Sequence, residues 1–388
     1  MVVVSPLFPP ARGGLADHTH RLARSLAQHR PVRVLTTRGA SPEPDLEVFD
    51  PITNWHRLSE LETALDDCPA ESPILWQYVP HMYGRGGINI ALLRQLRRLQ
   101  RRGRHQILIA HEIKAPLHWK PSRLIYALWH RFAWQSIRQS IPIIGISTEA
   151  WLQSWPSDWD HTKNDFFVLP SPSNVSLVQT RPDHRRVWRE KLGLKSNAPV
   201  LGYFGTWGAS KQPEWIFAAW RHARATGIPA VLVLLGGDPP QNISEDDRPF
   251  FRSLGYIPEV EVSLALQAFD LLLLPFEDGV SERRTSFTAG LSHGTPILTT
   301  VGHGTGTTLR SARFIASIPV NSPSAFPIEA VRLLGDPNRL SKLASDSIQA
   351  YHQSFSWEIV TKRLLKRLRS RPPNPGMEEM ETSGHQDR

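Results

Sequence analysis

Short apolar runs alternate with amphipathic segments along almost the whole chain, and this alternation constrains the fold more than any other feature. Runs such as Val2–Val4 and Leu271–Leu274 are typical of strands that are buried on both faces of a sheet. Segments such as Ile88–Arg102 place leucines on one helical face and arginines on the other. Strands that alternate with helices form parallel sheets with helices on both faces, so the sequence predicts an α/β fold.

The alternation falls into two blocks. The strands predicted in the first block are Val2–Val4, Val32–Thr36, Ile74–Val79, Ile107–His111, Ile141–Ile146 and Phe166–Leu169. The strands predicted in the second block are Val200–Phe204, Ala230–Leu235, Leu271–Leu274, Ile297–Thr300 and Phe314–Pro319. The predicted helices cover 15–28, 88–102, 122–139, 185–192, 213–225, 260–269, 284–292, 324–334, 340–351 and 354–370. Two such blocks predict two doubly wound parallel sheets.

A proline- and serine-rich stretch, "LPSPSNVSL" (Leu169–Leu177), separates the blocks. A length of 388 residues is enough for about two domains of ordinary size. The expected segments are an N-terminal domain (1–175), a C-terminal domain (176–352), a terminal helix (353–370) and a disordered tail (371–388). Ser356 is the expected N-cap of the terminal helix.

The composition limits the compartment but leaves the partner open. Cys68 is the only cysteine, which excludes an internal disulfide and fits a reducing compartment, so we expect a cytoplasmic location. No run reaches the roughly 18 apolar residues that a membrane span needs, and Met1–Pro6 lacks the basic start of a signal peptide. The net charge of +9 suits a nucleic acid, an anionic membrane face or a phosphorylated ligand.

The stretch "FEDGVSERRTSF" (Phe276–Phe287) directly follows a predicted buried strand and combines a glycine turn, two arginines and several hydroxyls. Backbone amides, hydroxyls and guanidinium groups at the start of a helix are the groups that bind a diphosphate. The candidate anion-binding residues are Gly279, Val280, Ser281, Arg283, Arg284, Thr285 and Ser286. The alternative is a solvated helix start, but ligands bind open α/β sheets at the carboxyl ends of strands, which is where this stretch lies.

Two further glycine loops also lie between a predicted strand and a helix. Gly13 and Gly14 let the backbone approach a ligand at a helix N-terminus, although a tight strand–helix connection explains them equally well. Gly205 and Gly208 follow a strand, and Lys211 precedes the next helix, where a lysine can reach an anion held by the loop. The alternative for Lys211 is an ordinary surface lysine.

Other short patterns lack a residue that their chemistry needs. "GHGTGT" (Gly302–Thr307) has Thr307 where a dinucleotide loop has its third glycine. "HEIKA" (His111–Ala115) lacks the second histidine of a zinc helix. We therefore expect no metal site.

Taken together, these stretches resemble the retaining GT-B glycosyltransferases of the family-4 (group 1) type, over nearly the whole chain. The stretches that carry the resemblance are "GGLADHTHRLARSL" (Gly13–Leu26), "QYVPHMYGRGG" (Gln77–Gly87), "AHE" (Ala110–Glu112), "GISTEAW" (Gly145–Trp151), "LPSPSNV" (Leu169–Val175), "FGTWGASK" (Phe204–Lys211), "DGVSERRTSF" (Asp278–Phe287), "HGTPILTT" (His293–Thr300) and "FSWE" (Phe355–Glu358). The resemblance implies two Rossmann-like domains facing a cleft. The C-terminal domain would bind a nucleotide-sugar donor and the N-terminal domain most of the acceptor, and the last helix would cross back onto the first domain.

The resemblance also implies roles for individual residues. Lys211 would bind the donor diphosphate, and the loop with Gly13 and Gly14 would close on it. His111 would contact the transferring sugar, although a histidine that merely ends a strand is the alternative. The residues that would frame the nucleotide base are Gly255, Tyr256 and Ile257.

The sequence departs from the family pattern after the first donor-domain strand, at the phosphate loop. Many relatives carry an arginine directly after the glycine that corresponds to Gly205, and this chain has Thr206 there. We expect Arg284 or Arg283 to supply the missing charge.

The usual pair of family glutamates is also absent, because their positions fall on Ser281 and Ala289. Glu277 and Glu282 are the candidates that could replace the acidic contact.

The expected reaction is metal-independent transfer of a sugar from a nucleotide-diphosphate sugar to a glycan or a lipid-linked acceptor, with retention. The nucleotide sugar is a substrate, so we expect no cofactor. Lys211, Arg284 and nearby amides would stabilise the leaving diphosphate.

Three alternatives stay open. One is a non-catalytic relative that binds a sugar nucleotide or a partner enzyme. Another is a nucleic-acid binder, although the chain has no recognition-helix signature and we expect no nucleic-acid partner. The third concerns the arginine-rich helix face at Arg94–Arg104, which is either a solvated face or, with Arg123–Trp134, a contact to an anionic membrane.

Overall fold

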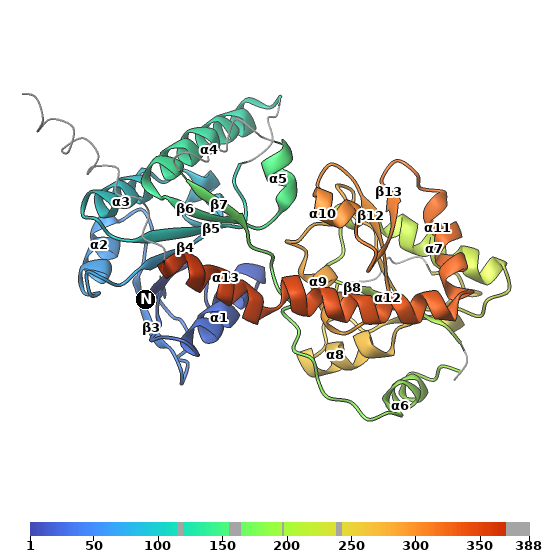
Figure 1. The fold of residues 1–388 in the computed structure, drawn as a ribbon. Helices are drawn as coiled ribbons and strands as arrows, with labels where there is room; N and C mark the ends of the chain where they lie inside the picture. Colours follow the sequence, from blue (N-terminus) through green and yellow to red (C-terminus); the bar gives the residue numbers. More distant parts are fainter. Residues whose placement is uncertain (115–118, 155–163, 196–197, 238–242, 370–388) are drawn as a thin grey trace, which may run out of the picture. The chain divides into compact units, whose positions relative to one another are not determined.

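The computed structural model describes residues 1–114, 119–154, 164–195, 198–237 and 243–369 (Figure 1). The chain divides into two compact units. Unit 1 comprises the described parts of Met1–Ile146, Asp158–Phe167 and Thr361–Arg388, and unit 2 those of Ser147–Ser157 and Val168–Val360. The tail expected to be disordered, 371–388, lies outside the described residues.

Within the described residues of unit 1, seven strands form one sheet in the order β3-β2-β1-β4-β5-β6-β7. The strands are β1 (Val2–Val4), β2 (Arg33–Thr37), β3 (Glu47–Ile52), β4 (Ile74–Tyr78), β5 (Gln106–Ala110), β6 (Ile143–Ile146) and β7 (Asp165–Val168). Pairing is parallel from β3 through to β6. The central strands β1, β4 and β5 are buried along their whole length because helices cover both faces, and only Gln77 and Gln106 interrupt their apolar sequences.

Helices cover the unit 1 sheet on both faces (Figure 1). They are α1 (Gly14–Ala27), α2 (Leu58–Asp66), α3 (Ile90–Arg101), α4 (Pro121–Ser140) and, from Thr361 on, α13 (Trp357–Arg369). The hydroxyls of Ser25 in α1 and Thr361 in α13 lie 2.7 Å apart. Arg367 of α13 places its guanidinium 3.9 Å from the centre of the Phe167 ring, so this helix is anchored on unit 1. Ser356 caps α13 as predicted, because its Oγ accepts a hydrogen bond from the Ile359 N–H (3.3 Å).

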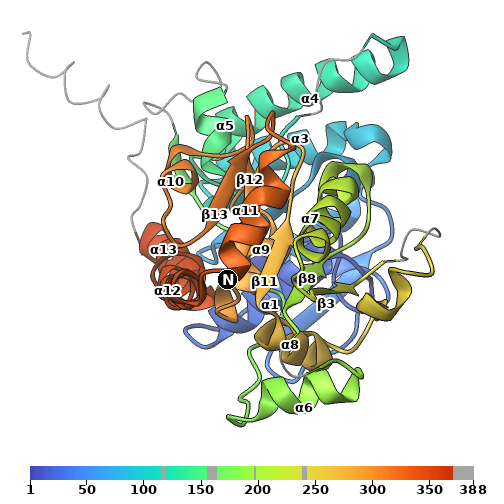
Figure 2. The same ribbon diagram turned by 90° about the vertical axis from the view of Figure 1, so that its right-hand side faces the viewer.

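Six parallel strands form the sheet in the described part of unit 2, in the order β10-β9-β8-β11-β12-β13. They are β8 (Val200–Phe204), β9 (Val231–Leu235), β10 (Phe251–Ser253), β11 (Leu271–Leu274), β12 (Ile297–Val301) and β13 (Ala316–Pro319). The helices are α5 (Glu149–Ser154), α6 (His184–Lys191), α7 (Pro213–Ala225), α8 (Glu259–Ala268), α9 (Thr285–Ser292), α10 (Thr307–Arg310), α11 (Ala325–Leu334) and α12 (Pro337–Ala350). Figure 2 looks onto this unit, where α7 and α11 pack side by side through Trp215 and Phe326, whose ring centroids are 5.5 Å apart.

The strand order of each sheet reverses once. In unit 1 the chain runs outward from β1 to β3 and returns to the other side of β1 with β4, and in unit 2 the same reversal lies between β8 and β11. Loops leave neighbouring strands in opposite directions at such a point, which opens a crevice at their carboxyl ends where α/β proteins bind ligands. Among the described residues, no helix combines the length and hydrophobicity that crossing a bilayer requires.

Candidate functional site

The loop that leaves β11 in unit 2 is held tightly against the loop that leaves β12. Gly279 has a φ of 89°, and a Cβ there would lie 2.3 Å from both Gly302 N and Thr305 Oγ1, so no other residue fits. The Gly304 N–H donates a hydrogen bond to the Asp278 carbonyl oxygen (2.7 Å). The Gly302–Thr307 loop, which lacks the third glycine of a dinucleotide loop, therefore supports the turn that carries Asp278.

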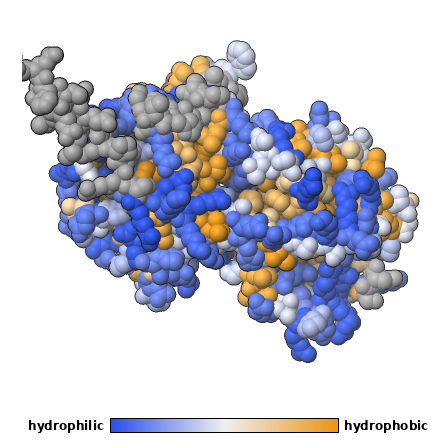
Figure 3. Space-filling view, in the orientation of Figure 1, coloured by the Kyte–Doolittle hydropathy of each residue, from blue (hydrophilic) through white to orange (hydrophobic). Residues whose placement is uncertain are grey.

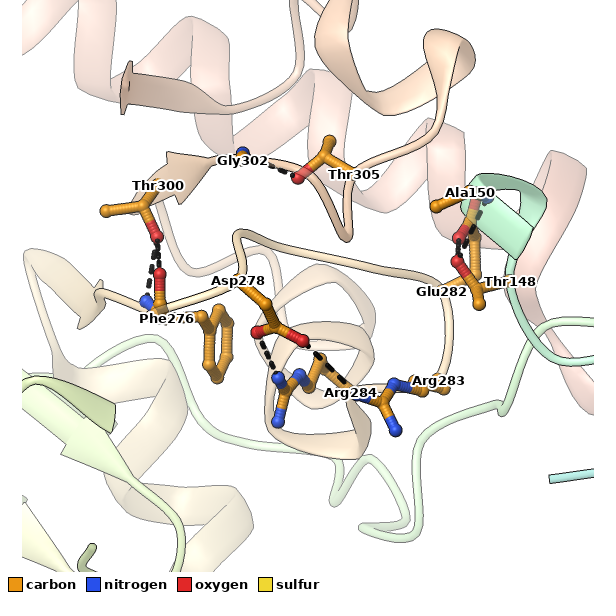
Figure 4. Close-up of polar contacts among 10 residues, drawn as sticks. All are labelled: Thr148, Ala150, Phe276, Asp278, Glu282, Arg283, Arg284, Thr300, Gly302 and Thr305. Atoms are coloured by element: carbon orange, nitrogen blue, oxygen red, sulfur yellow. Dashed lines mark hydrogen bonds and ion pairs between the residues drawn. The ribbon is translucent and has the colours of Figure 1, made fainter. Parts of the chain in front are cut away.

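This turn is also tied to the end of β12. The Phe276 N–H donates to Thr300 Oγ1 (2.7 Å), and the same hydroxyl donates to the Phe276 carbonyl (2.6 Å) (Figure 4). The Val280 N–H donates to the Thr300 carbonyl (2.8 Å). These contacts fix the turn on both sides of Asp278.

At this turn the cationic side chains of Lys211, Arg283 and Arg284 lie around the carboxylate of Asp278 and the buried ring of Phe276. We call these five residues the cationic cluster. Asp278 Oδ2 accepts from Arg283 (3.2 Å) and its Oδ1 pairs with Arg284 (Figure 4). The Arg284 guanidinium lies 4.6 Å from the centre of the Phe276 ring, and Lys211 Nζ lies 4.8 Å from it. With one carboxylate against three cations, the cluster has an excess of positive charge.

Lys211 reaches the cluster because its backbone is attached to the β11 loop. The Glu277 N–H donates to the Ser210 carbonyl (3.1 Å) and the Lys211 N–H to the Gly208 carbonyl (2.9 Å). Gln212 then adopts a left-handed conformation, φ 43° and ψ 60°, and α7 begins directly after it. Lys211 stands just before a helix, as predicted.

Burial and like charge weaken the cationic forms of two of these groups. Burial, which is the larger cause, and the neighbouring Arg284 charge together lower the pKa of Lys211 to about 8, while Asp278 opposes the shift. Burial also lowers the pKa of Arg284, again against the effect of Asp278. An anion placed among these groups would relieve their mutual repulsion, so the electrostatics favour binding of a multiply charged anion.

Two polar atoms beside the cluster lack a hydrogen-bond partner in the part of the chain that is described. They are Ser281 Oγ and Arg284 Nε, and both are buried. Thr285 and Ser286 begin α9, and no side chain caps that helix. The turn therefore offers unused donors at a helix N-terminus, which is an anion-binding arrangement.

The glycine loop after β8 packs on the loops that follow the next two strands. Gly205 has a φ of 143°, and its carbonyl would lie only 2.9 Å from a Cβ at Gly236. Gly236 in turn donates its N–H to the Gly255 carbonyl (2.8 Å). Thr206 uses its carbonyl to accept from the Tyr203 hydroxyl (2.8 Å). The predicted base-framing segment thus joins the predicted phosphate loop at one edge of unit 2.

The residues after Gly255 differ in exposure. Tyr256 is 81% exposed and Ile257 is partly buried. An aromatic side chain in this position is available to stack on a planar ligand.

The two candidate replacements for the family glutamates lie in different environments. Glu282 is buried, and its carboxylate accepts a hydrogen bond from the Thr148 hydroxyl (2.8 Å) (Figure 4). Burial raises the pKa of Glu282. Glu277 is exposed next to Ser210 and Lys211. Of the two, Glu277 is the one with an exposed side chain, while Glu282 is engaged inside unit 2.

In unit 1, two histidines form a second cluster at the carboxyl ends of β4 and β5, which we call the histidine pair: His18 and His111. Their ring centroids are 4.6 Å apart at an interplanar angle of 78°. Nε2 of His111 donates to Oε1 of Gln77 in β4 (2.5 Å). Burial lowers the pKa of His111 to about 4 and that of His18 well below its ordinary value, so both rings are neutral near pH 7.

Gly13 and Gly14 belong to unit 1, like the histidine pair, and lie at the start of α1. Gly13 has a φ of 134°, and neither Gly13 nor Gly14 has an atom within 4 Å of a Cβ position. His18 lies one helical turn beyond Gly14 on α1. The open backbone and the histidine pair therefore occupy neighbouring positions around α1.

Sequence reasoning missed four residues of these clusters: Phe276, Asp278, His18 and Gln77. Asp278 had a detectable signal, because an acid five and six residues before two adjacent arginines is well placed to pair with them across a turn. Nothing local marks His18 or Gln77, because their contacts depend on how α1, β4 and β5 meet in the fold.

Among the described residues, no group of three or more metal-ligating side chains is gathered at any one place.

Comparison with known proteins adds information on the fold. No family model and no curated protein matches this sequence. Solved structures do match, over about 95% of the chain. Sucrose-phosphate synthase from Thermosynechococcus elongatus has a TM-score of 0.69 at 15% identity, covering 95% of this chain and 98% of that one. WaaG, a glycosyltransferase involved in lipopolysaccharide biosynthesis, has a TM-score of 0.66 at 17% identity, covering 95% and 100%.

A third match is HepE from Anabaena, whose structure was solved with UDP. Its TM-score is 0.67 at 14% identity, with 95% of this chain and 98% of that chain covered. Likeness at this level of identity concerns the fold. The chain therefore has the two Rossmann-like α/β units of the GT-B fold, as the resemblance implied.

Proposed function

We propose that this protein is a glycosyltransferase that moves a sugar from a nucleotide-diphosphate sugar to an acceptor. The observation that carries the proposal is the cationic cluster, in which Lys211, Arg283 and Arg284 surround Asp278 at the carboxyl end of β11. This is the strand-order reversal of unit 2, where α/β folds bind ligands. HepE, a structure with the same fold, was solved with UDP and with UDP-glucose, which supports a nucleotide-sugar donor.

The chemical demand of this reaction matches the charges of the cluster. When the bond from the sugar to the diphosphate breaks, negative charge grows on the leaving phosphate. Lys211 and Arg284 would stabilise that charge, together with the amides of Gly279–Ser281. Groups that are fixed before the reaction stabilise a transition state most effectively, and loss of one typically slows the rate by about 10²–10³. The three cations would also take the place of a metal ion, so we propose a metal-independent reaction.

We further propose that transfer proceeds with retention, as in the family-4 enzymes that the sequence resembles, and that the donor sugar is a hexose. In such a reaction the departing phosphate would take the proton of the acceptor hydroxyl. The acceptor would be a glycan or a lipid-linked glycan.

For unit 1 we propose that the histidine pair binds a sugar hydroxyl. Neutral imidazoles can donate and accept hydrogen bonds without competing for the diphosphate charge. His111 would make the contact, and Gln77 would fix its orientation and tautomer through the 2.5 Å hydrogen bond. Gly13 and Gly14 would offer free backbone N–H groups to an anion at the start of α1.

The proposal is tested first by a thermal-shift screen of nucleotide sugars, and then by turnover of the donor that stabilises the protein. Lys211→Ala and Arg284→Ala should each reduce donor turnover by about 10²-fold or more. Lys342→Ala is the matched control, because Lys342 is an exposed lysine of unit 2 on α12. Wild-type rates in both cluster variants would refute the assignment, and activity that EDTA abolishes would refute metal independence.

A second candidate function is a non-catalytic protein that binds a sugar nucleotide. The observation in its favour is that Ser281 and Ala289 stand where the family has its two glutamates, while Glu282 is engaged by Thr148. Calorimetry that shows donor binding, combined with no transfer or hydrolysis over a panel of acceptors, would establish this candidate in place of the first.

A further inference from the structure

One face of α4 exposes large apolar side chains in a row. Ile125, Leu128 and Phe132 are 60%, 54% and 57% exposed, and their spacing of three and four residues puts them on one side of the helix. Trp119, just before the helix, is fully exposed. Figure 3 shows hydrophobic surface at the upper edge of unit 1, at one end of α4.

The row is additional to the core-facing side of the helix. Ala127, Trp134 and Ile137 of α4 are buried in unit 1. The helix is therefore apolar on two sides, one of which faces solvent. Contiguous exposed apolar side chains of this kind mark a surface that contacts another apolar phase or partner.

The neighbouring helix α3 adds positive charge. Arg94, Arg97 and Arg101 are exposed, share one face with Ile90, and have no ion-pair partner among the described residues. Arg98, by contrast, is paired with Glu62 of α2. Helices α3 and α4 pack against each other, and Gln100 of α3 donates a hydrogen bond to the Gln139 carbonyl at the end of α4 (2.8 Å).

Acidic residues are missing from both helices. The sequences of α3 and α4, "IALLRQLRRLQR" and "PSRLIYALWHRFAWQSIRQS", contain no aspartate or glutamate. Two adjacent helices without an acid of their own therefore carry an apolar row on one and a row of arginines on the other.

We propose that this surface, made of Ile125, Leu128 and Phe132 on α4 with Arg94, Arg97 and Arg101 on α3, docks unit 1 on an anionic lipid bilayer. A bilayer interface offers both anionic headgroups and an apolar layer, and basic amphipathic helices bind there by inserting their apolar side. A nucleic acid would satisfy the arginines and leave the apolar row in water. A second copy of the chain, related by two-fold symmetry, would bring two arginine rows together.

The experiment is flotation of the full chain with vesicles of phosphatidylcholine alone and of phosphatidylcholine with phosphatidylglycerol. The wild type should float with the anionic vesicles and lose binding at high salt. The triple variant Ile125→Ser, Leu128→Ser, Phe132→Ser should bind at least about tenfold more weakly. In the triple variant Arg94→Gln, Arg97→Gln, Arg101→Gln, each lost arginine should weaken binding to the anionic vesicles about fivefold.

Ile328→Ser is the matched control, because Ile328 on α11 of unit 2 is 59% exposed. It should float like the wild type, and thermal unfolding should show that every variant is folded. The proposal is overturned if the wild type does not float with anionic vesicles, or if the apolar triple variant floats as well as the control. It is also overturned if light scattering finds a dimer that the apolar triple variant dissociates while vesicles bind neither protein.

Discussion

The carboxylate of Asp278 pairs with the guanidinium of Arg284, which in turn lies 4.6 Å from the centre of the buried Phe276 ring. The same carboxylate also holds Arg283 at 3.2 Å. Burial works against the charge of Arg284, and Asp278 works in its favour. Asp278 therefore acts as the internal counter-ion of the cationic cluster, and it holds the arginines where an external anion could replace it.

Replacing Asp278 with asparagine should separate its stabilisation of the arginines from its competition with an external anion. Asp278→Asn should lower the free energy of unfolding by about 1–3 kcal/mol, because a partly buried arginine loses its counter-ion. It should also increase the thermal shift caused by a nucleotide sugar, because the diphosphate then supplies the missing negative charge. Thermal unfolding with and without a saturating nucleotide sugar measures both quantities.

Asp247→Asn is the control for this experiment. Asp247 pairs with Arg221 (3.0 Å) and with Arg224, and its side chain is even more buried than that of Asp278, 13% against 24% exposed. Its loss should reduce stability without changing the thermal shift given by the ligand. Equal ligand shifts in Asp278→Asn and the wild type would contradict the counter-ion role.

Donor affinity should depend on pH through Lys211. Its pKa is lowered to about 8, so the free protein loses this positive charge as the pH rises through that value. A nucleotide sugar keeps both diphosphate charges over this range, so its affinity should be constant below about pH 7 and fall by up to tenfold per pH unit above the pKa. Titration calorimetry between about pH 6.5 and 9.5 measures this profile.

Lys211→Arg provides the comparison, because arginine stays protonated over the whole range. Its donor affinity should be nearly independent of pH, even if it is weaker than that of the wild type at pH 7. The same decline in both proteins would assign the titration to another group.

The sequence predicted the architecture well because the signals are local. A central strand such as β8 or β11 is covered by helices on both faces, so it must be apolar throughout, and its limits matched the prediction. The strands that were missed, β3 and β10, lie at sheet edges. Their residues are mostly half-buried, so their sequences lack a continuous apolar run.

The same distinction applies to the candidate sites. Gly279 and Lys211 are recognisable from turn chemistry and from their place beside a strand or a helix. The stacking of His18 on His111 joins α1 to the end of β5, and no pattern within either segment encodes it. Pairing of distant segments is set by sheet topology, which was predicted only as a class and without a strand order.

The histidine pair should make unit 1 sensitive to acid. Both folded-state pKa values lie below the ordinary value of 6.5, so the unfolded chain binds protons first as the pH falls. Stability should be complete above about pH 6.5 and decline toward pH 4. Between pH 6.5 and pH 4, His111→Gln should reduce the loss in the free energy of unfolding by on the order of 2–3 kcal/mol. Chemical denaturation at several pH values measures it.

His29→Gln is the matched control, because His29 is an exposed histidine of the same unit. It should leave the acid sensitivity unchanged. If His111→Gln and the wild type lose stability in parallel down to pH 4, the buried pair is not the source of the sensitivity.

Gln212 adopts a conformation that costs free energy for any residue except glycine. Its φ of 43° and ψ of 60° lie in the left-handed region, where a side chain crowds its own backbone by about 1 kcal/mol or more. Gln212→Gly should remove that strain and, after the added flexibility of the unfolded chain is subtracted, raise the free energy of unfolding by about 0.5–1 kcal/mol. Thermal unfolding of the variant measures the gain.

The position of Gln212 makes the same variant informative about Lys211. Gln212 joins Lys211 to α7, so the left-handed turn directs the lysine backbone toward the β11 loop. Glycine preserves that turn, and donor affinity should therefore be unchanged, whereas Gln212→Val should reduce both stability and affinity because a β-branched residue resists positive φ. As a control, Gln28→Gly replaces a residue of ordinary φ (−63°) at the end of α1 and should destabilise the protein. Stabilisation by both glycine variants, or by neither, would show that backbone strain at Gln212 does not govern the effect.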